Sequence, residues 1–173
     1  PAAASPDAGF RAPEGADPVL TGQGLDLATD PSEGAYPSGL SAISTAAWRL
    51  YLLTGDTRYR DAATAGMVRL VGTGDLNPLA FGAALRLVNA LTTPVEQLVV
   101  VTPDPAAAGD ALVDAARRRQ GLVAVVTQEQ AEDFAAAGFE LFAERGIRQG
   151  RPTAYLCRDF VCRLPTTDAA ALA

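Results

Sequence analysis

Two cysteines, Cys157 and Cys162, are the residues whose type and spacing could carry covalent chemistry in this sequence. They lie on or beside a predicted β-hairpin, and facing strands could bring the two sulfur atoms within disulfide reach. A redox pair more often has the spacing C-x-x-C at a helix N-terminus, where the thiolate is stabilised. Because the predicted turn is very short, we expect two reduced, at least partly buried thiols that act as packing groups.

Other nucleophiles, bases and metal ligands are scarce. The sequence has no histidine, which excludes histidine triads, histidine metal ligands and a histidine general base. It has no lysine either, which excludes Schiff-base and phosphate-loop lysines. A zinc site would need two ligands beyond the two cysteines. We therefore expect no metal and no cofactor.

A second candidate site precedes the first predicted helix and consists of Glu33, Tyr36 and Ser38. The ring of Tyr36 offers a flat apolar face with a polar tip, which suits a sugar ring. Glu33 could accept hydrogen bonds from hydroxyl groups or act as an acid or base. The same segment could instead be a plain helix entry, in which Pro37 fixes the chain and Ser38 caps the helix. The sequence leaves both interpretations open.

The loop after the first predicted strand, Thr102 to Pro105, lies where open α/β sheets bind ligands. It lacks a glycine-rich fingerprint, and Asp104 would put a carboxylate where a phosphate would otherwise lie. We therefore interpret Asp104 as the cap of the following helix and not as part of a nucleotide site.

Three helical patterns lie in the first half of the chain, at about residues 38–53, 57–71 and 78–91. Gly55 and Asp56 separate the first two, as a left-handed helix end and an N-cap. Three helices cannot hide all of the apolar faces that this stretch carries, at Leu40, Ile43, Trp48, Leu79 and Leu87. We therefore expect a large exposed apolar surface or its burial by a partner.

The second half changes to short, β-branched apolar runs. Residues 97–101 and 122–126 predict two buried strands joined by a helix, which is a parallel, right-handed unit. A further helix is expected at 128–137. Two last strands, at 153–157 and 160–164, are predicted to be joined by a tight turn at Arg158 and Asp159.

Composition limits the class of protein. The chain has 173 residues, 49% of them hydrophobic, and a net charge of −6. An acidic chain argues against a nucleic-acid partner, and the apolar runs are too short to span a bilayer. No signal peptide is visible, so a cytoplasmic location is expected. We divide the chain into an extended arm or loop, helices that look like part of a larger helical ring or bundle, a small α/β region and a tail, at residues 1–35, 36–93, 94–168 and 169–173.

Several runs, in this order and spacing, resemble one family over about residues 33–168. They are YPSGLS at 36–41, LLTGD at 52–56 and TAYLCRDFVC at 153–162. The family is YyaL-like, also called spermatogenesis-associated-protein-20-like. Its members pair an N-terminal thioredoxin-like domain with an α/α toroid similar to N-acylglucosamine 2-epimerases. The resemblance implies an α/β fragment: helical hairpins of an incomplete toroid, then a small parallel βαβ unit and a β-hairpin.

The resemblance also implies partners and functions. The partners would be the rest of the parent chain, meaning its thioredoxin-like domain and earlier toroid helices, and a carbohydrate. The implied function is binding or isomerising a sugar in the full-length protein. The alternatives are the scaffold part of a thiol-redox or quality-control protein, and a structural interaction module. Those epimerases use histidine, so no catalytic residue carries over, and Leu40 stands where the family usually has asparagine.

Overall fold

A computed structural model describes residues 17–24, 32–72, 77–104 and 110–172. These residues form a mixed α/β structure with two compact units. The first unit runs to Tyr51 and includes Asp56–Thr92, and we call it the helical unit. The second consists of Leu52–Gly55 and the chain from Thr93 onwards, and we call it the α/β unit.

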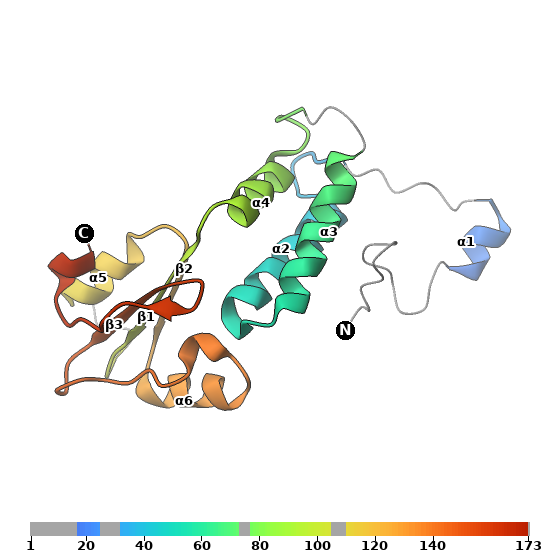
Figure 1. The fold of residues 1–173 in the computed structure, drawn as a ribbon. Helices are drawn as coiled ribbons and strands as arrows, with labels where there is room; N and C mark the ends of the chain where they lie inside the picture. Colours follow the sequence, from blue (N-terminus) through green and yellow to red (C-terminus); the bar gives the residue numbers. More distant parts are fainter. Residues whose placement is uncertain (1–16, 25–31, 73–76, 105–109, 173) are drawn as a thin grey trace. The chain divides into compact units, whose positions relative to one another are not determined.

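Four helices of the described residues lie wholly or mostly in the helical unit (Figure 1): α1 (Pro18–Gly22), α2 (Gly39–Thr54), α3 (Thr57–Val71) and α4 (Gly82–Thr92). The end of α2, from Leu52 onwards, belongs to the α/β unit. The sequence placed α2 and α3 correctly. It missed α1, a five-residue helix capped by Asp17 inside the stretch expected to be an arm. It also began α4 too early, because Asn77 accepts a hydrogen bond from the amide of Leu79 and holds a turn before the helix.

Local residues explain the break between α2 and α3. Gly55 has a φ of 72°, in the left-handed region that glycine adopts without steric cost. The carboxylate of Asp56 accepts a hydrogen bond from the amide of Arg58 and caps α3. Both expectations for this link are confirmed.

The two long helices approach closely at Gly66 of α3. A Cβ atom added there would lie 2.3 Å from the Ser44 hydroxyl oxygen of α2, and 3.4 Å from a methyl group of Leu40. Ser41 and Ser44 of α2 are both fully buried. Small side chains at this contact therefore let the helix backbones approach each other.

Some of the apolar residues that we expected to be exposed are exposed in the structure. Among the five apolar residues named from the sequence, Trp48 and Leu87 are buried. Ile43 and Leu79 are exposed, and Leu40 is half-buried. The structure thus covers some of the helix faces that the pattern left open and leaves others in contact with solvent.

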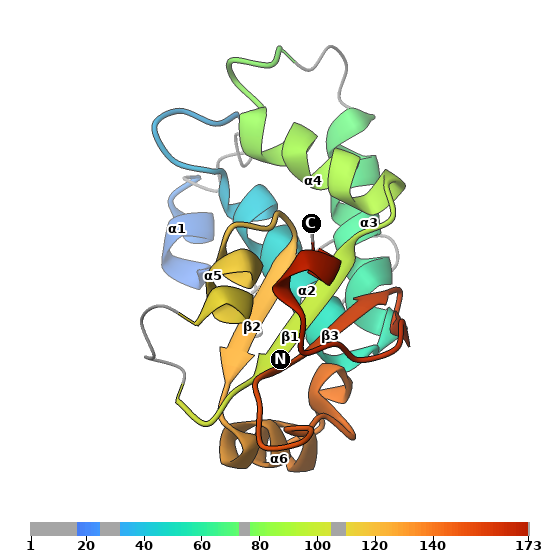
Figure 2. The same cartoon turned by 90° about the vertical axis from the view of Figure 1, so that its left-hand side faces the viewer.

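The α/β unit is built on a four-stranded sheet in the order β2-β1-β3-β4 (Figure 2). Its strands are β1 (Glu96–Val101), β2 (Leu122–Val126), β3 (Thr153–Arg158) and β4 (Val161–Cys162). The pair β1–β2 is parallel, as the sequence predicted, and the pairs β1–β3 and β3–β4 are antiparallel. The sheet is therefore mixed, and β4 lies at its edge.

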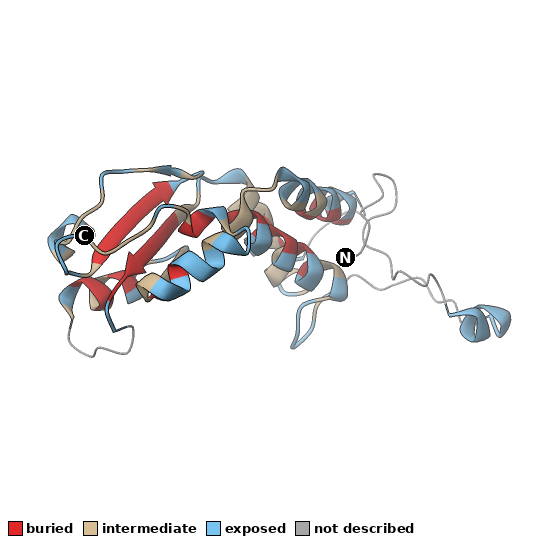
Figure 3. Ribbon diagram, turned by 90° about the horizontal axis from the view of Figure 1, so that it is seen from below, coloured by how far each residue is buried: buried red, intermediate tan, exposed pale blue. Residues whose placement is uncertain are grey.

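Helices cover both faces of this sheet, and the buried residues concentrate in its strands (Figure 3). One face packs against α5 (Ala111–Arg117) and the short helix η2 (Ala169–Leu172), through residues such as Leu98 and Leu156. The other packs against α6 (Gln128–Ala136) and η1 (Glu140–Phe142), through Val99 and Tyr155. The period of two along each strand sends alternate side chains to opposite faces.

Two expectations about the ends of elements in this unit are wrong. The described part of α5 begins at Ala111 with Asp110 as its N-cap, so Asp104 does not cap this helix. Pro105 lies outside the described residues. The expected tail at 169–173 contains η2, and Leu172 is buried against the α5 face of the sheet because its side chain completes that core.

The last hairpin turns one residue later than predicted. Asp159 and Phe160 have φ values of 48° and 63°, and Arg158 pairs with Val161. Positive φ at both central residues is the geometry of the two-residue hairpin turn that matches strand twist. Phe160 adopts it because its amide donates a 3.0 Å hydrogen bond to Oε1 of the fully buried Gln97.

Candidate functional site

The two cysteines form a disulfide between β3 and β4. The expectation of two reduced thiols is therefore wrong. The physical reason is the register: with the turn at Asp159 and Phe160, Cys157 lies directly opposite Cys162. A turn at Arg158 and Asp159 would instead have placed Cys157 opposite Phe160.

The two sulfur-bearing residues differ in access. Cys157 is only 1% exposed and lies on β3, inside the sheet. Cys162 is half-buried and lies on the edge strand β4. A reagent from solvent therefore meets Cys162 first.

The guanidinium group of Arg145 faces both sulfur atoms. Its Nη2 lies 3.0 Å from Sγ of Cys162 and 4.0 Å from Sγ of Cys157. Arg145 forms no ion pair with a carboxylate among the described residues, and its Nε is buried without a hydrogen-bond partner there. A cation beside a neutral disulfide has no counter-ion, whereas a thiolate at the same place would supply one.

Tyr155 holds Arg145 in this position in two ways. Its ring lies under the guanidinium carbon, 5.1 Å from the ring centroid. Its hydroxyl group donates to the carbonyl oxygen of Gly146 at 2.7 Å and accepts from the Gly146 amide at 3.1 Å. Oε1 of Gln128, at the start of α6, accepts from the amide of Ile147 at 2.9 Å. The two residues that follow Arg145 are therefore held in place by Tyr155 and Gln128.

Arg145 and Tyr155 did not emerge as site residues from the sequence. Tyr155 lies in the TAYLC run but carries no signal of a second role. Arg145 precedes Cys157 by twelve positions, in a stretch without a recognisable motif. Only the tertiary structure brings these side chains to the disulfide.

The other candidate segment has mostly structural roles. The carboxylate of Glu33 accepts hydrogen bonds from the amides of Ala83 and Ala84, at 2.7 and 3.1 Å, and so caps α4. Ser38 Oγ accepts from the Ser41 amide at 3.2 Å and caps α2, as the helix-entry interpretation predicts. Tyr36 is 84% exposed. Glu33 and Ser38 thus act as helix caps, and the ring of Tyr36 lies in solvent.

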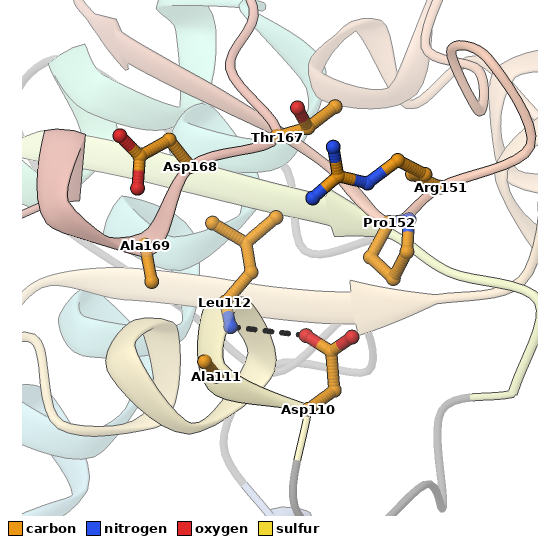
Figure 4. Close-up of a pocket in the computed structure, with 8 residues that line it drawn as sticks. All are labelled: Asp110, Ala111, Leu112, Arg151, Pro152, Thr167, Asp168 and Ala169. Atoms are coloured by element: carbon orange, nitrogen blue, oxygen red, sulfur yellow. Dashed lines mark hydrogen bonds between the residues drawn. The ribbon is translucent and has the colours of Figure 1, made fainter.

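A pocket of about 430 Å³ lies at the start of α5 (Figure 4). Its two carboxylates already cap short helices: Asp110 accepts from the Leu112 amide at 3.0 Å, and Asp168 accepts from the Ala170 amide at 2.9 Å. Arg151 lines the same pocket. Both acids among the described lining residues therefore accept hydrogen bonds from amides at helix starts.

The charged cluster nearest the hairpin is also structural. Glu96 of β1 contacts Arg119 at 2.5 Å and Arg158, opposite it on β3, at 3.2 Å. The hydrogen bond from Arg119 is the main reason that the pKa of Glu96 lies below its ordinary value. Within the described residues, no group of three acidic or sulfur side chains could hold a metal ion, and no helix could cross a membrane.

No family model, curated protein or solved structure matches the chain. Among the described residues, the disulfide is a group that can undergo covalent exchange, and Arg145 is the cation that faces it.

Proposed function

We propose that the chain is the C-terminal part of a thioredoxin-domain-containing protein with an epimerase-like toroid. Its own part in that protein is thiol–disulfide exchange at Cys157 and Cys162. The order of the sequence motifs supports the first statement, and so does the hairpin of α2 and α3. The second statement rests on the disulfide site.

The observation that carries the exchange function is the position of Arg145. Its Nη2 is 3.0 Å from Cys162 Sγ and has no competing carboxylate among the described residues. Reduction of the disulfide would create thiolates beside this cation. A cation that stabilises the reduced form raises the reduction potential and makes the disulfide a better oxidant.

The test is the reduction potential of the Cys157–Cys162 pair at pH 7. The protein is equilibrated with glutathione or dithiothreitol redox buffers, and the free thiols are alkylated and counted by mass spectrometry. We expect a reduction potential above about −300 mV, because the potentials of structural disulfides lie below that value. Arg145→Gln should lower the potential by about 30 mV, the equivalent of one charge-assisted hydrogen bond.

Arg163→Gln is the matched control, because Arg163 is exposed, lies next to Cys162 and forms no ion pair within the described part of the chain. It should leave the potential within a few millivolts of the parent value. A potential below about −300 mV, or an Arg145→Gln variant with the parent's potential, would refute the exchange function.

The exposed ring of Tyr36 favours a second candidate function, sugar binding by the full-length protein. A ring that is 84% exposed, between the residues that cap α4 and α2, can stack on the C–H face of a sugar. The test is to titrate monosaccharides and disaccharides into the full-length protein and to repeat this with Tyr36→Ala. Undiminished binding by the variant would remove Tyr36 from the site.

A further inference from the structure

We infer that a protein dithiol reduces the disulfide by attacking Cys162 and by docking on the exposed apolar side chains of Val161 and Leu164. This inference rests on the proposed exchange function and adds the attacked sulfur and the kind of partner. The partner is a protein that carries two neighbouring thiols, with apolar surface around the attacking one.

The choice of sulfur follows from burial. Thiol–disulfide exchange needs a thiolate to approach one sulfur atom along the S–S axis, from the side opposite the other sulfur. Cys157 is 1% exposed and lies between β1 and the edge strand. Cys162 is half-buried and lies on that edge. A thiolate that comes from solvent therefore attacks the sulfur atom of Cys162.

The docking surface follows from the distribution of exposed apolar side chains. Val161 is 77% exposed and Leu164 is 92% exposed, and both lie within two residues of Cys162. In the described residues of the α/β unit, Phe134 is the one other large apolar side chain that is exposed. Because β4 is the edge strand, a partner that reaches this edge meets side chains of both faces of the sheet.

The positive charge near Cys162 favours a partner with an anionic attacking group. Nη2 of the half-buried Arg145 lies 3.0 Å from Sγ of Cys162, and Arg145 is not paired with a carboxylate in the described part of the protein. A cation beside the attacked sulfur attracts a thiolate, because a thiolate is an anionic nucleophile. The apolar side chains next to this cation therefore fit a partner whose attacking thiolate is surrounded by apolar surface.

The partner reduces the disulfide in two steps. The partner's first thiolate forms a bond to Sγ of Cys162, the Cys157–Cys162 bond breaks, and Cys157 leaves as a thiolate 4.0 Å from Nη2 of Arg145. The partner's second thiol loses its proton and attacks the partner's first sulfur, which releases Cys162 as a thiolate 3.0 Å from the same nitrogen. Two electrons pass to the cystine, the partner becomes a disulfide, and the two thiol protons of the partner balance the two new thiols.

The first test traps the intermediate. The unmodified protein is mixed with a thioredoxin whose resolving cysteine is replaced by serine, so that the reaction stops at the mixed disulfide. Digestion and mass spectrometry then locate the linked cysteine. We expect the link at Cys162, and a link at Cys157 would overturn the assignment.

The second test compares a protein reductant with a small one. The double variant Val161→Ser with Leu164→Ser is reduced by intact thioredoxin and, separately, by dithiothreitol. We expect the ratio of the two rates to fall about tenfold, because only the protein reductant uses the apolar contact. The double variant Val68→Ser with Leu79→Ser also loses two exposed apolar side chains, but from the helical unit, and it should keep the parent ratio.

The outcomes separate the inference from the proposed function. An unchanged ratio for the Val161 and Leu164 variant, with a reduction potential as expected, would overturn the docking surface alone. A potential in the range of structural disulfides would overturn the exchange function itself. If the double variant does not fold, the single variant Leu164→Ser, at a residue outside β4, gives the same comparison.

Discussion

The backbone amide of Phe160 donates a hydrogen bond of 3.0 Å to Oε1 of Gln97, a side chain that is fully buried in β1. Nε2 of the same side chain donates to the carbonyl oxygen of Leu52 at 2.7 Å. The Phe160 ring also lies against Gly55, since a Cβ atom added there would be 3.7 Å from it. These contacts hold a bulky residue in the left-handed region, which places Cys162 opposite Cys157.

Replacing Gln97 with methionine should therefore affect both stability and the disulfide. The variant leaves the buried Leu52 carbonyl and the Phe160 amide without their partner, so we expect the free energy of unfolding to fall by ~2–4 kcal/mol. We also expect a smaller fraction of the protein to carry the disulfide after refolding in a glutathione buffer. Urea denaturation and thiol counting measure the two effects. Gln120→Met, at an exposed position, should change neither, and a parent-like Gln97→Met would contradict this role.

Stability should depend on pH through Glu96. Its pKa is lowered in the folded protein, chiefly by the hydrogen bond from Arg119, so its contribution is present above the ordinary pKa of about 4.3. The contribution is lost as the pH falls through the lower, folded value. We expect Glu96→Gln to be ~1 kcal/mol less stable than the parent at pH 7 and equal to it near pH 2. Urea denaturation across this range, with Glu129→Gln as control, tests it. A pH-independent difference would contradict the ion-pair explanation.

The close contact between α2 and α3 should not tolerate a methyl group. Gly66→Ala would place its Cβ atom 2.3 Å from Ser44 Oγ, so the helices must shift or the serine must change rotamer. We expect a loss of ~1–3 kcal/mol, in the range of overpacked cores. Gly82→Ala, at the start of α4 where an added Cβ atom meets nothing within 4 Å, is the control and should be neutral or slightly stabilising. Thermal unfolding of both variants decides the matter, and equal midpoints would count against the contact.

The cap on α4 should make Glu33 more important to stability than Tyr36. Glu33→Ala removes the acceptor for the amides of Ala83 and Ala84, and we expect ~1 kcal/mol of destabilisation. Tyr36→Ala removes an exposed ring and should stay within ~0.5 kcal/mol of the parent. Denaturant titrations of the two variants give the comparison. If Tyr36→Ala proved the more damaging of the two, the ring would have a packing role that its exposure does not indicate.

Some elements were predictable because the residues that fix them are neighbours in the sequence. The bounds of α3 follow from Gly55 and Asp56 on one side and from a glycine end on the other. The strand β2 is an uninterrupted apolar run rich in valine, and its parallel pairing with β1 follows from the helix between them. In these places the local preferences of the backbone already agree with the final structure.

The candidate site was predictable only in part, because its geometry depends on contacts between distant residues. The sequence identified Cys157 and Cys162, but their bond requires a turn that Gln97 stabilises from 63 positions away. The cap that Glu33 forms on α4 joins residues 50 positions apart. Arg145 reaches the sulfur atoms because the Tyr155 hydroxyl group fixes its loop. Composition and local preference thus determined the helices α2, α3 and α6, most strands and the two cysteines. Tertiary structure alone decided the hairpin register and the cation at the disulfide, since both depend on buried hydrogen bonds that form only after the chain has folded.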